Sequence, residues 1–188
     1  MNYYKSNSSE LFGEYNSLPP AEVHSTWLAH LPSSPGLACD LGAGSGRDAN
    51  WLAEQGWNVT AVEPCDELRE LAQANSHANV TWLNDSVPAL TKLTVTASCF
   101  DLILCSAMWM HLSFTEQAQA LSYLKPMLAD KGIIVITWRN VAGEVDRGFY
   151  DVDERFFGNA TIIVSDDQRG REGVVWKCVV LTKANLQG

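Results

Sequence analysis

Strand-sized apolar runs alternate with segments of helical periodicity over the first 138 residues of the chain. Residues 100–105 and 132–138 are almost continuously apolar, which is typical of strands buried on both faces of a parallel sheet. Residues 115–129 instead place apolar side chains at helical spacing. In chain order the pattern predicts a helix at 21–31, a strand at 36–41, a helix at 47–55, a strand at 57–63, a helix at 66–74, strands at 80–83 and 100–105, a helix at 115–129 and a strand at 132–138.

The pattern changes after Trp138. Two short apolar runs, 161–165 and 173–182, are separated by a polar segment and predict an antiparallel hairpin. Residues 150–157 are the single helical candidate before this hairpin, so a connecting helix there must be short or distorted. Together the elements predict one α/β domain. We expect a doubly wound, mostly parallel sheet of seven strands, with helices on both faces and a C-terminal antiparallel hairpin.

Composition and charge narrow the class of protein. The 188 residues are 46% hydrophobic and 19% charged, a balance typical of one globular domain. The net charge of −9 comes without a cluster of Lys and Arg, which disfavours nucleic acid as a partner. Apolar runs are too short to span a membrane and residues 1–10 lack the apolar core of a signal peptide, so we expect a cytoplasmic protein without a membrane partner. The five cysteines show no zinc-like spacing, and we expect reduced thiols and no metal site.

A glycine-rich segment follows the first expected strand and leads into a helix. It reads Asp40-x-Gly42-x-Gly44-x-Gly46 and continues with Arg47. A dinucleotide-binding turn requires its third glycine at the position that Arg47 occupies. In addition, the Asp40 carboxylate is a poor neighbour for a pyrophosphate but suits a ligand that carries an ammonium group. S-adenosylmethionine (SAM) carries an ammonium and a sulfonium, so the segment favours SAM over NAD.

A second acidic residue ends the next expected strand. Glu63 lies 21 residues after Gly42, where a carboxylate can accept hydrogen bonds from both hydroxyls of a ribose. NAD sites share this feature. Glu63 therefore supports an adenosine ligand without choosing between the two cofactors.

At this point the chain resembles the class I SAM-dependent methyltransferases, from about Leu37 to Trp138. The glycine-rich segment resembles their first motif, and Glu63 resembles the acidic residue that follows it. The segments 84–86 (Asn-Asp-Ser), 100–107 and 124–136 resemble three later motifs in the same order. The resemblance implies SAM as the cofactor and a seventh strand that lies antiparallel beside the fifth. It also implies a division of the domain into an N-terminal lid or helix (1–32), a cofactor-binding core (36–138) and a C-terminal substrate-side segment (139–184).

The resemblance also implies roles for individual residues. On the acceptor side we expect Arg139, Trp109 and Tyr15, while the hairpin residues Arg169 and Arg171 either bind an anionic acceptor or are solvated. His111 is a candidate general base, or a residue that orders its loop. The N-terminal aromatic residues Tyr3, Tyr4, Phe12, Tyr15 and Trp27 are expected to cover the cofactor, although Trp27 can equally pack on the sheet edge. The residues expected to bind the cofactor are Asp40, Gly42, Ala43, Gly44, Gly46, Arg47, Glu63, Pro64, Asp85, Ser86, Cys105 and Ser106.

The sequence predicts an enzyme that transfers a methyl group from SAM. The chain carries no added substrate domain, which favours a small-molecule acceptor, and its oligomeric state is left open. Two alternatives remain at this point. The first is a SAM-binding module without catalytic activity. The second is an NAD-binding oxidoreductase, which the missing third glycine and the missing Tyr-x-x-x-Lys pair disfavour.

Overall fold

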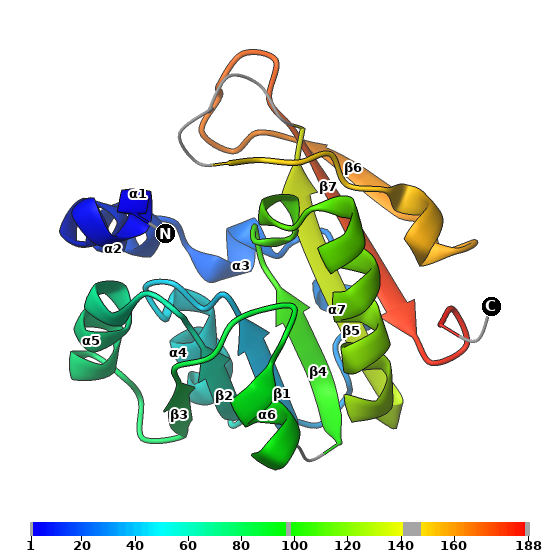
Figure 1. Ribbon diagram of the computed structural model, residues 1–188, viewed down its shortest axis with the longest axis horizontal. Coiled ribbons are helices and arrows are strands. Elements are labelled where there is room, and N and C mark those ends of the chain that lie inside the picture. Colours follow the sequence, from blue (N-terminus) through cyan, green and yellow to red (C-terminus); the bar gives the residue numbers. More distant parts are fainter. Residues whose placement is uncertain (1, 97–98, 141–147, 187–188) are drawn as a thin grey trace.

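The computed structural model describes residues 2–96, 99–140 and 148–186, and a seven-stranded sheet lies at its centre (Figure 1). The sheet order is β3-β2-β1-β4-β5-β7-β6. Strands β1 to β5 are parallel to one another, and β7 is antiparallel to both β5 and β6. The expected fold class and the antiparallel strand beside the fifth are confirmed. The strands are Leu37–Leu41 (β1), Asn58–Val62 (β2), Val80–Leu83 (β3), Phe100–Cys105 (β4), Leu128–Arg139 (β5), Ile162–Asp166 (β6) and Val175–Thr182 (β7).

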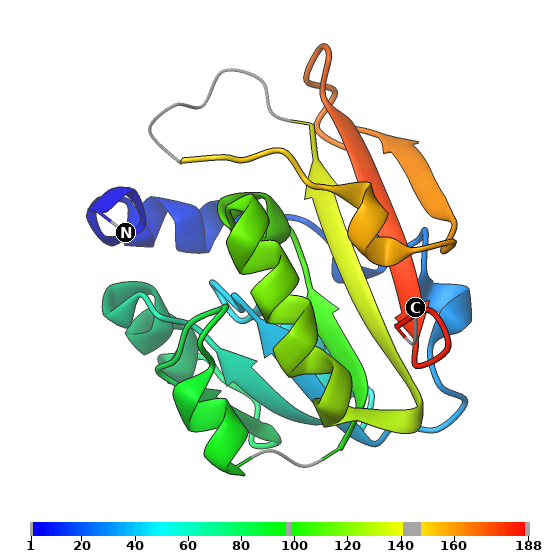
Figure 2. The same cartoon turned by 45° about the vertical axis from the view of Figure 1, so that its right-hand side comes forward.

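Helices cover both faces of the sheet because its central strands are apolar on both sides. Successive side chains of a strand point to opposite faces. In β4, Leu102 and Leu104 join the apolar cluster that contains Leu52 of α4, whereas Ile103 joins the cluster that contains Leu124 of α7. Helices α6 and α7 lie in front of the sheet in Figures 1 and 2, and α4 lies behind it. The helices after β1 are Arg47–Glu54 (α4), Asp66–Ala74 (α5), Thr91–Thr96 (α6) and Phe114–Met127 (α7).

The predicted helix at 21–31 is wrong. The chain forms a short helix, Pro20–Val23 (α3), then turns, and ends in the 3₁₀ segment Leu28–His30 (η1). His24 and Trp27, which lie in the turn, are both fully buried and contact each other. Tertiary packing of these two rings therefore overrides the helical propensity of the segment. At the other end of the chain the candidate helix 150–157 is reduced to the 3₁₀ turn Glu154–Phe157 (η4), as the short connection implied.

Two N-terminal helices were not predicted. They are Asn2–Ser6 (α1) and Ser8–Asn16 (α2), and both contact α5 beside the carboxyl ends of the parallel strands (Figure 1). An ion pair of 2.7 Å between Lys5 Nζ and Glu67 Oε1 joins α1 to α5. Helix α6 was also missed, because the sequence around Pro88 indicated only a loop. No helix in the described part of the chain is long and apolar enough to cross a lipid bilayer.

Candidate active site

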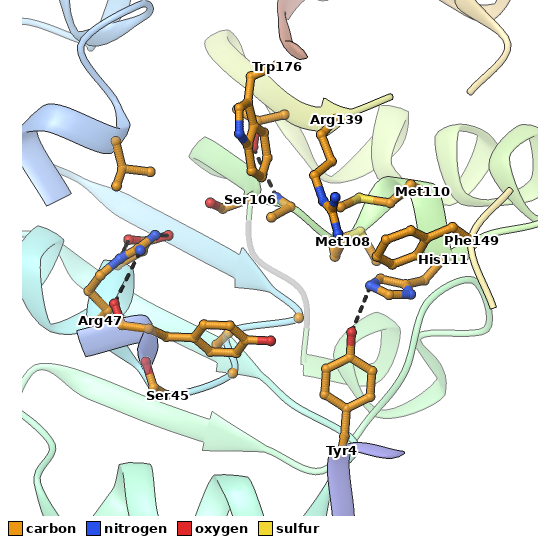
Figure 3. Close-up of a pocket in the computed structure, with 18 of the residues that line it drawn as sticks. Tyr4, Ser45, Arg47, Ser106, Met108, Met110, His111, Arg139, Phe149 and Trp176 are labelled. Carbon is orange, nitrogen blue, oxygen red and sulfur yellow. Dashed lines mark hydrogen bonds and ion pairs between the residues drawn. The ribbon is translucent and has the colours of Figure 1, made fainter. Parts of the chain in front are cut away.

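A cavity of about 710 Å³ lies at the carboxyl ends of the parallel strands. This size is typical of pockets for small ligands. Its walls come from the loops after β1, β2, β3, β4 and β5, from the N-terminal helices and from the β6–β7 turn. Figure 3 shows Arg47 and Ser45 on one side of the cavity, across from Arg139, Met108, Phe149 and His111. The cavity thus joins most of the predicted cofactor residues to Arg139 and Tyr15, two of the three predicted acceptor residues.

The glycine-rich turn contributes the backbone of one wall. Gly42, Gly44 and Gly46 all adopt positive φ, at 70°, 55° and 75°, which glycine tolerates best. Gly42 and Gly44 line the cavity together with Ala43. Gly46 does not. A Cβ on Gly46 would lie 2.9 Å from the indole ring of Trp82, so this glycine is required by packing and not by the cavity. Its predicted contact with the cofactor is not supported by this placement.

Glu63 is held by the backbone and faces the cavity. Its Oε2 accepts a hydrogen bond of 2.9 Å from the Gly44 N–H, and its Oε1 accepts one of 2.8 Å from the Cys65 N–H. Burial raises the pKa of Glu63, while the two backbone donors lower it. A carboxylate offers about four acceptor positions, so each oxygen can still accept a hydroxyl donor. The arrangement fits the ribose that the sequence predicted. Pro64, beside Glu63, also lines the cavity.

Asp85, which was predicted to bind the cofactor, has a structural role in the loop after β3. Its Oδ1 accepts from the Ser86 N–H at 2.9 Å. Its Oδ2 accepts from the N–H groups of Lys92 and Leu93, at 2.7 and 2.9 Å, and so caps the start of α6. Asp85 and Ser86 both line the cavity. The carboxylate therefore fixes the loop that borders the cavity, and its contact with adenine stays a prediction.

Asp40 lies under the glycine turn and outside the cavity wall. It is 1% exposed, and its Oδ2 has no hydrogen-bond partner among the described residues. Burial raises the pKa of Asp40 well above its usual range, and the nearby Asp48 carboxylate raises it further. A buried oxygen without a donor is unfavourable. Because Asp40 does not border the cavity, its predicted contact with the ammonium group of a ligand stays a prediction.

The far end of the cavity carries a cluster of aromatic and cationic side chains. The Tyr4 hydroxyl lies 2.9 Å from His111 Nε2, and the His111 ring meets Phe149 edge-on at a centroid distance of 4.7 Å. The Arg139 guanidinium lies over the same Phe149 ring, 5.0 Å from its centroid (Figure 3). His111 belongs to the 3₁₀ turn Trp109–His111 (η2), and Arg139 ends β5. Sequence reasoning missed Phe149, because a single aromatic residue in an irregular segment gives no pattern.

Besides Asp40 and Gly46, two further predicted site residues are not in the cavity wall. Trp109 is fully buried in the core, so its predicted contact with the acceptor does not occur in this structure. Cys105 is also fully buried, and burial raises the pKa of its thiol. Ser106 and Tyr15 do line the cavity. In the β6–β7 turn, Arg171 pairs with Asp167, and Arg169 pairs with Glu14 of α2, so the turn is tied to the N-terminal helices.

Comparison with known proteins agrees with this geometry. A family model described as a methyltransferase domain matches residues 39–136. An uncharacterized methyltransferase of Alkaliphilus oremlandii is 33% identical over 105 residues, which are 54% of this chain and 44% of that relative. The chain thus spans less than half the length of this relative.

Solved structures share the fold at low identity. The 1,6-didemethyltoxoflavin N1-methyltransferase of Burkholderia thailandensis, crystallised with 1,6-didemethyltoxoflavin and S-adenosylhomocysteine, is 21% identical with a TM-score of 0.66, over 95% of this chain and 87% of that one. The N-methyltransferase NodS of Bradyrhizobium japonicum WM9, in complex with S-adenosylhomocysteine, is 16% identical with a TM-score of 0.69, over 94% and 97%. These likenesses show a common fold.

Proposed function

The chain belongs to the methyltransferase domain family of class I, SAM-dependent fold, and on this premise we propose that it transfers a methyl group from SAM to a small-molecule acceptor. The observation that carries the proposal is the continuity of the cavity. One space of about 710 Å³ connects the glycine turn and Glu63 to the cluster of Tyr4, His111, Phe149 and Arg139. A cofactor at the first end and an acceptor at the second would meet inside it.

The first end of the cavity offers the groups that a SAM molecule needs. The Glu63 carboxylate would accept the ribose hydroxyls, and the loop of Asp85 and Ser86 would border the adenine. Positive φ at Gly42 and Gly44 lets the backbone approach the ligand closely. When bound, SAM supplies an activated methyl group. The residues of the chain then have to orient the acceptor and exclude water. In well-oriented reactions this lowers the activation barrier by about 7–11 kcal/mol.

The second end of the cavity suits a small acceptor because the N-terminal helices and the β6–β7 turn enclose it. Tyr4, Phe149 and Arg139 would contact the acceptor. The contacts of His111 with Tyr4 and Phe149 favour a role in ordering this end of the cavity. A general base is needed only if the acceptor must lose a proton before it attacks the methyl group. The N1-methyltransferase of Burkholderia thailandensis, whose fold this chain shares, was crystallised with 1,6-didemethyltoxoflavin, which supports a small-molecule acceptor.

Binding and turnover test the proposal separately. Calorimetry should give micromolar or tighter binding of SAM and S-adenosylhomocysteine, and no binding of NAD. Isotopically labelled SAM incubated with a metabolite library should then yield a labelled product. Binding of NAD without binding of SAM would overturn the proposal. Tight SAM binding without transfer to any member of a broad library would instead support the non-catalytic alternative.

A further inference from the structure

A chain of polar contacts leads from two buried rings behind the cavity to Asp48 and Arg47 in its wall. The Trp27 indole N–H donates to His24 Nδ1 at 3.2 Å. His24 Nε2 lies 2.9 Å from Asp48 Oδ1. Asp48 in turn accepts two hydrogen bonds from Arg47, from Nε to Oδ1 at 2.6 Å and from Nη2 to Oδ2 at 2.9 Å. The four side chains thus link the turn after α3 to the first residues of α4.

The contacts fix the proton on His24. An indole N–H can only donate, so His24 Nδ1 accepts, and the ring proton lies on Nε2, which faces Asp48. The rings of Trp27 and Trp51 lie 4.9 and 5.3 Å from the His24 ring, centroid to centroid, and hold it in this orientation. His24 and Trp27 are 0% exposed. His24 Nε2 approaches Asp48 Oδ1 closely without meeting hydrogen-bond geometry, so the ring is held by the Trp27 donor on Nδ1 and by the two indole rings.

Asp48 links His24 to Arg47 and fixes the position of the Arg47 guanidinium. Burial alone would raise the pKa of Asp48, but His24 and Arg47 together lower it well below its usual range, so the carboxylate is charged. Two parallel hydrogen bonds hold a guanidinium in one plane better than a single contact does. Arg47 then lines the cavity beside Ser45, with Nη1 3.4 Å from the Tyr15 carbonyl oxygen (Figure 3).

We propose that His24 is a positioning residue, which acts through Asp48 to hold Arg47 where it binds the carboxylate of the amino-acid part of SAM. The inference rests on the proposed function. Among the described cationic side chains that line the cavity, Arg47 is the one that follows the glycine turn, whereas the others come from β5 and from the β6–β7 hairpin. Arg47 therefore lies at the cofactor end. A guanidinium has five N–H donors, and those that Asp48 does not occupy can meet a carboxylate.

The test compares two ligands that differ in the amino-acid part. S-adenosylhomocysteine carries the amino and carboxylate groups, and 5′-methylthioadenosine lacks both. His24→Phe keeps a ring but removes the donor that faces Asp48, whereas His24→Gln keeps a donor there. We expect His24→Phe to weaken S-adenosylhomocysteine binding about tenfold, because it removes the polar contact that holds Asp48 and, through it, Arg47, and to change methylthioadenosine binding by less than about twofold. His24→Gln should restore most of the lost affinity.

A double-mutant cycle tests whether the effect of His24 on ligand affinity depends on Arg47. If His24 acts through Arg47, then His24→Phe should cause no further loss of affinity in the Arg47→Ala background. Asp48→Asn should show the same selective loss and serves as the test if His24→Phe does not fold. An equal loss for both ligands, or unchanged affinity for S-adenosylhomocysteine, would overturn the inference. Failure of the wild-type protein to bind S-adenosylhomocysteine would instead refute the proposed function.

Discussion

Replacing Gly44 and Gly46 separately with alanine should distinguish a glycine that borders the cavity from a glycine that packing requires. At Gly44 an added Cβ would lie 3.6 Å from the Tyr15 ring, an ordinary contact, so the cost is the left-handed backbone, about 1–2 kcal/mol. At Gly46 the same backbone cost applies, and the Cβ would also lie 2.9 Å from Cζ2 and 3.0 Å from Cη2 of Trp82. Overpacking of this kind adds about 1–3 kcal/mol. Gly46→Ala should therefore be clearly the more destabilising of the two.

Thermal unfolding and calorimetry measure the two effects. In a domain of this size 1 kcal/mol corresponds to about 2–4 °C. We thus expect the Tm to fall by about 2–8 °C in Gly44→Ala and by about 4–20 °C in Gly46→Ala. The losses of ligand affinity in the two variants should have the opposite order to the losses of Tm. Folded Gly44→Ala should lose at least about tenfold in affinity for S-adenosylhomocysteine because its Cβ enters the cavity, whereas folded Gly46→Ala should bind like the wild type.

The control is Gly13→Ala, since nothing lies within 4 Å of a Cβ at that exposed position. It should lower neither Tm nor affinity. Equal Tm losses in Gly44→Ala and Gly46→Ala would refute the packing argument. Wild-type affinity in Gly44→Ala, or lost affinity in a folded Gly46→Ala, would show that the wrong glycine has been assigned to the cavity.

Four further expectations concern other residues. Glu63→Ala should weaken binding of S-adenosylhomocysteine at least about tenfold in calorimetry, because hydrogen bonds to a charged group contribute about 1.5–3 kcal/mol each; unchanged affinity would exclude a ribose contact. Once an acceptor is known, His111→Ala should lower kcat by less than the roughly 10²–10⁴-fold effect of a general base. Arg139→Ala should raise the acceptor KM more than the Kd for SAM, and the reverse pattern would place the acceptor elsewhere. Of the cysteines, exposed Cys99 should react fastest with a thiol reagent at pH 8, since burial raises the pKa of Cys178 to about 11, and rapid labelling of several thiols in the folded protein would contradict the structure.

Local patterns predicted the parts of the molecule whose environment is set by neighbours in the chain. The strands at 80–83 and 100–105 were predicted to the residue, because each is a short, mainly apolar run that is followed by a polar residue, Asn84 or Ser106. The glycine turn and Glu63 follow from short motifs in the same way. The N-terminal helices gave no such signal, since α2 buries only Leu11 and therefore shows little amphipathic pattern.

Long-range contacts could not be predicted from these patterns. Tyr4 reaches His111 across 107 positions of the chain, and neither residue carries a local signal of the other. Gly46 was assigned to the cofactor because its motif suggested it, whereas its actual constraint is the Trp82 ring from another strand. His24 was predicted to lie in a regular helix, because its contact with Asp48 of another helix leaves no signal in the local pattern. In each case the deciding contact joins separate elements.

The contact between Glu14 and Arg169 joins α2 to the β6–β7 turn across 155 positions of the chain. Contacts of such sequence separation are costly to close and form late in folding. During synthesis the five parallel strands can assemble before the β6–β7 turn has left the ribosome. The part of the cavity wall that this turn contributes cannot form at that stage. A nascent chain that ends at β5 would therefore contain the five parallel strands but lack the β6–β7 turn that borders the cavity.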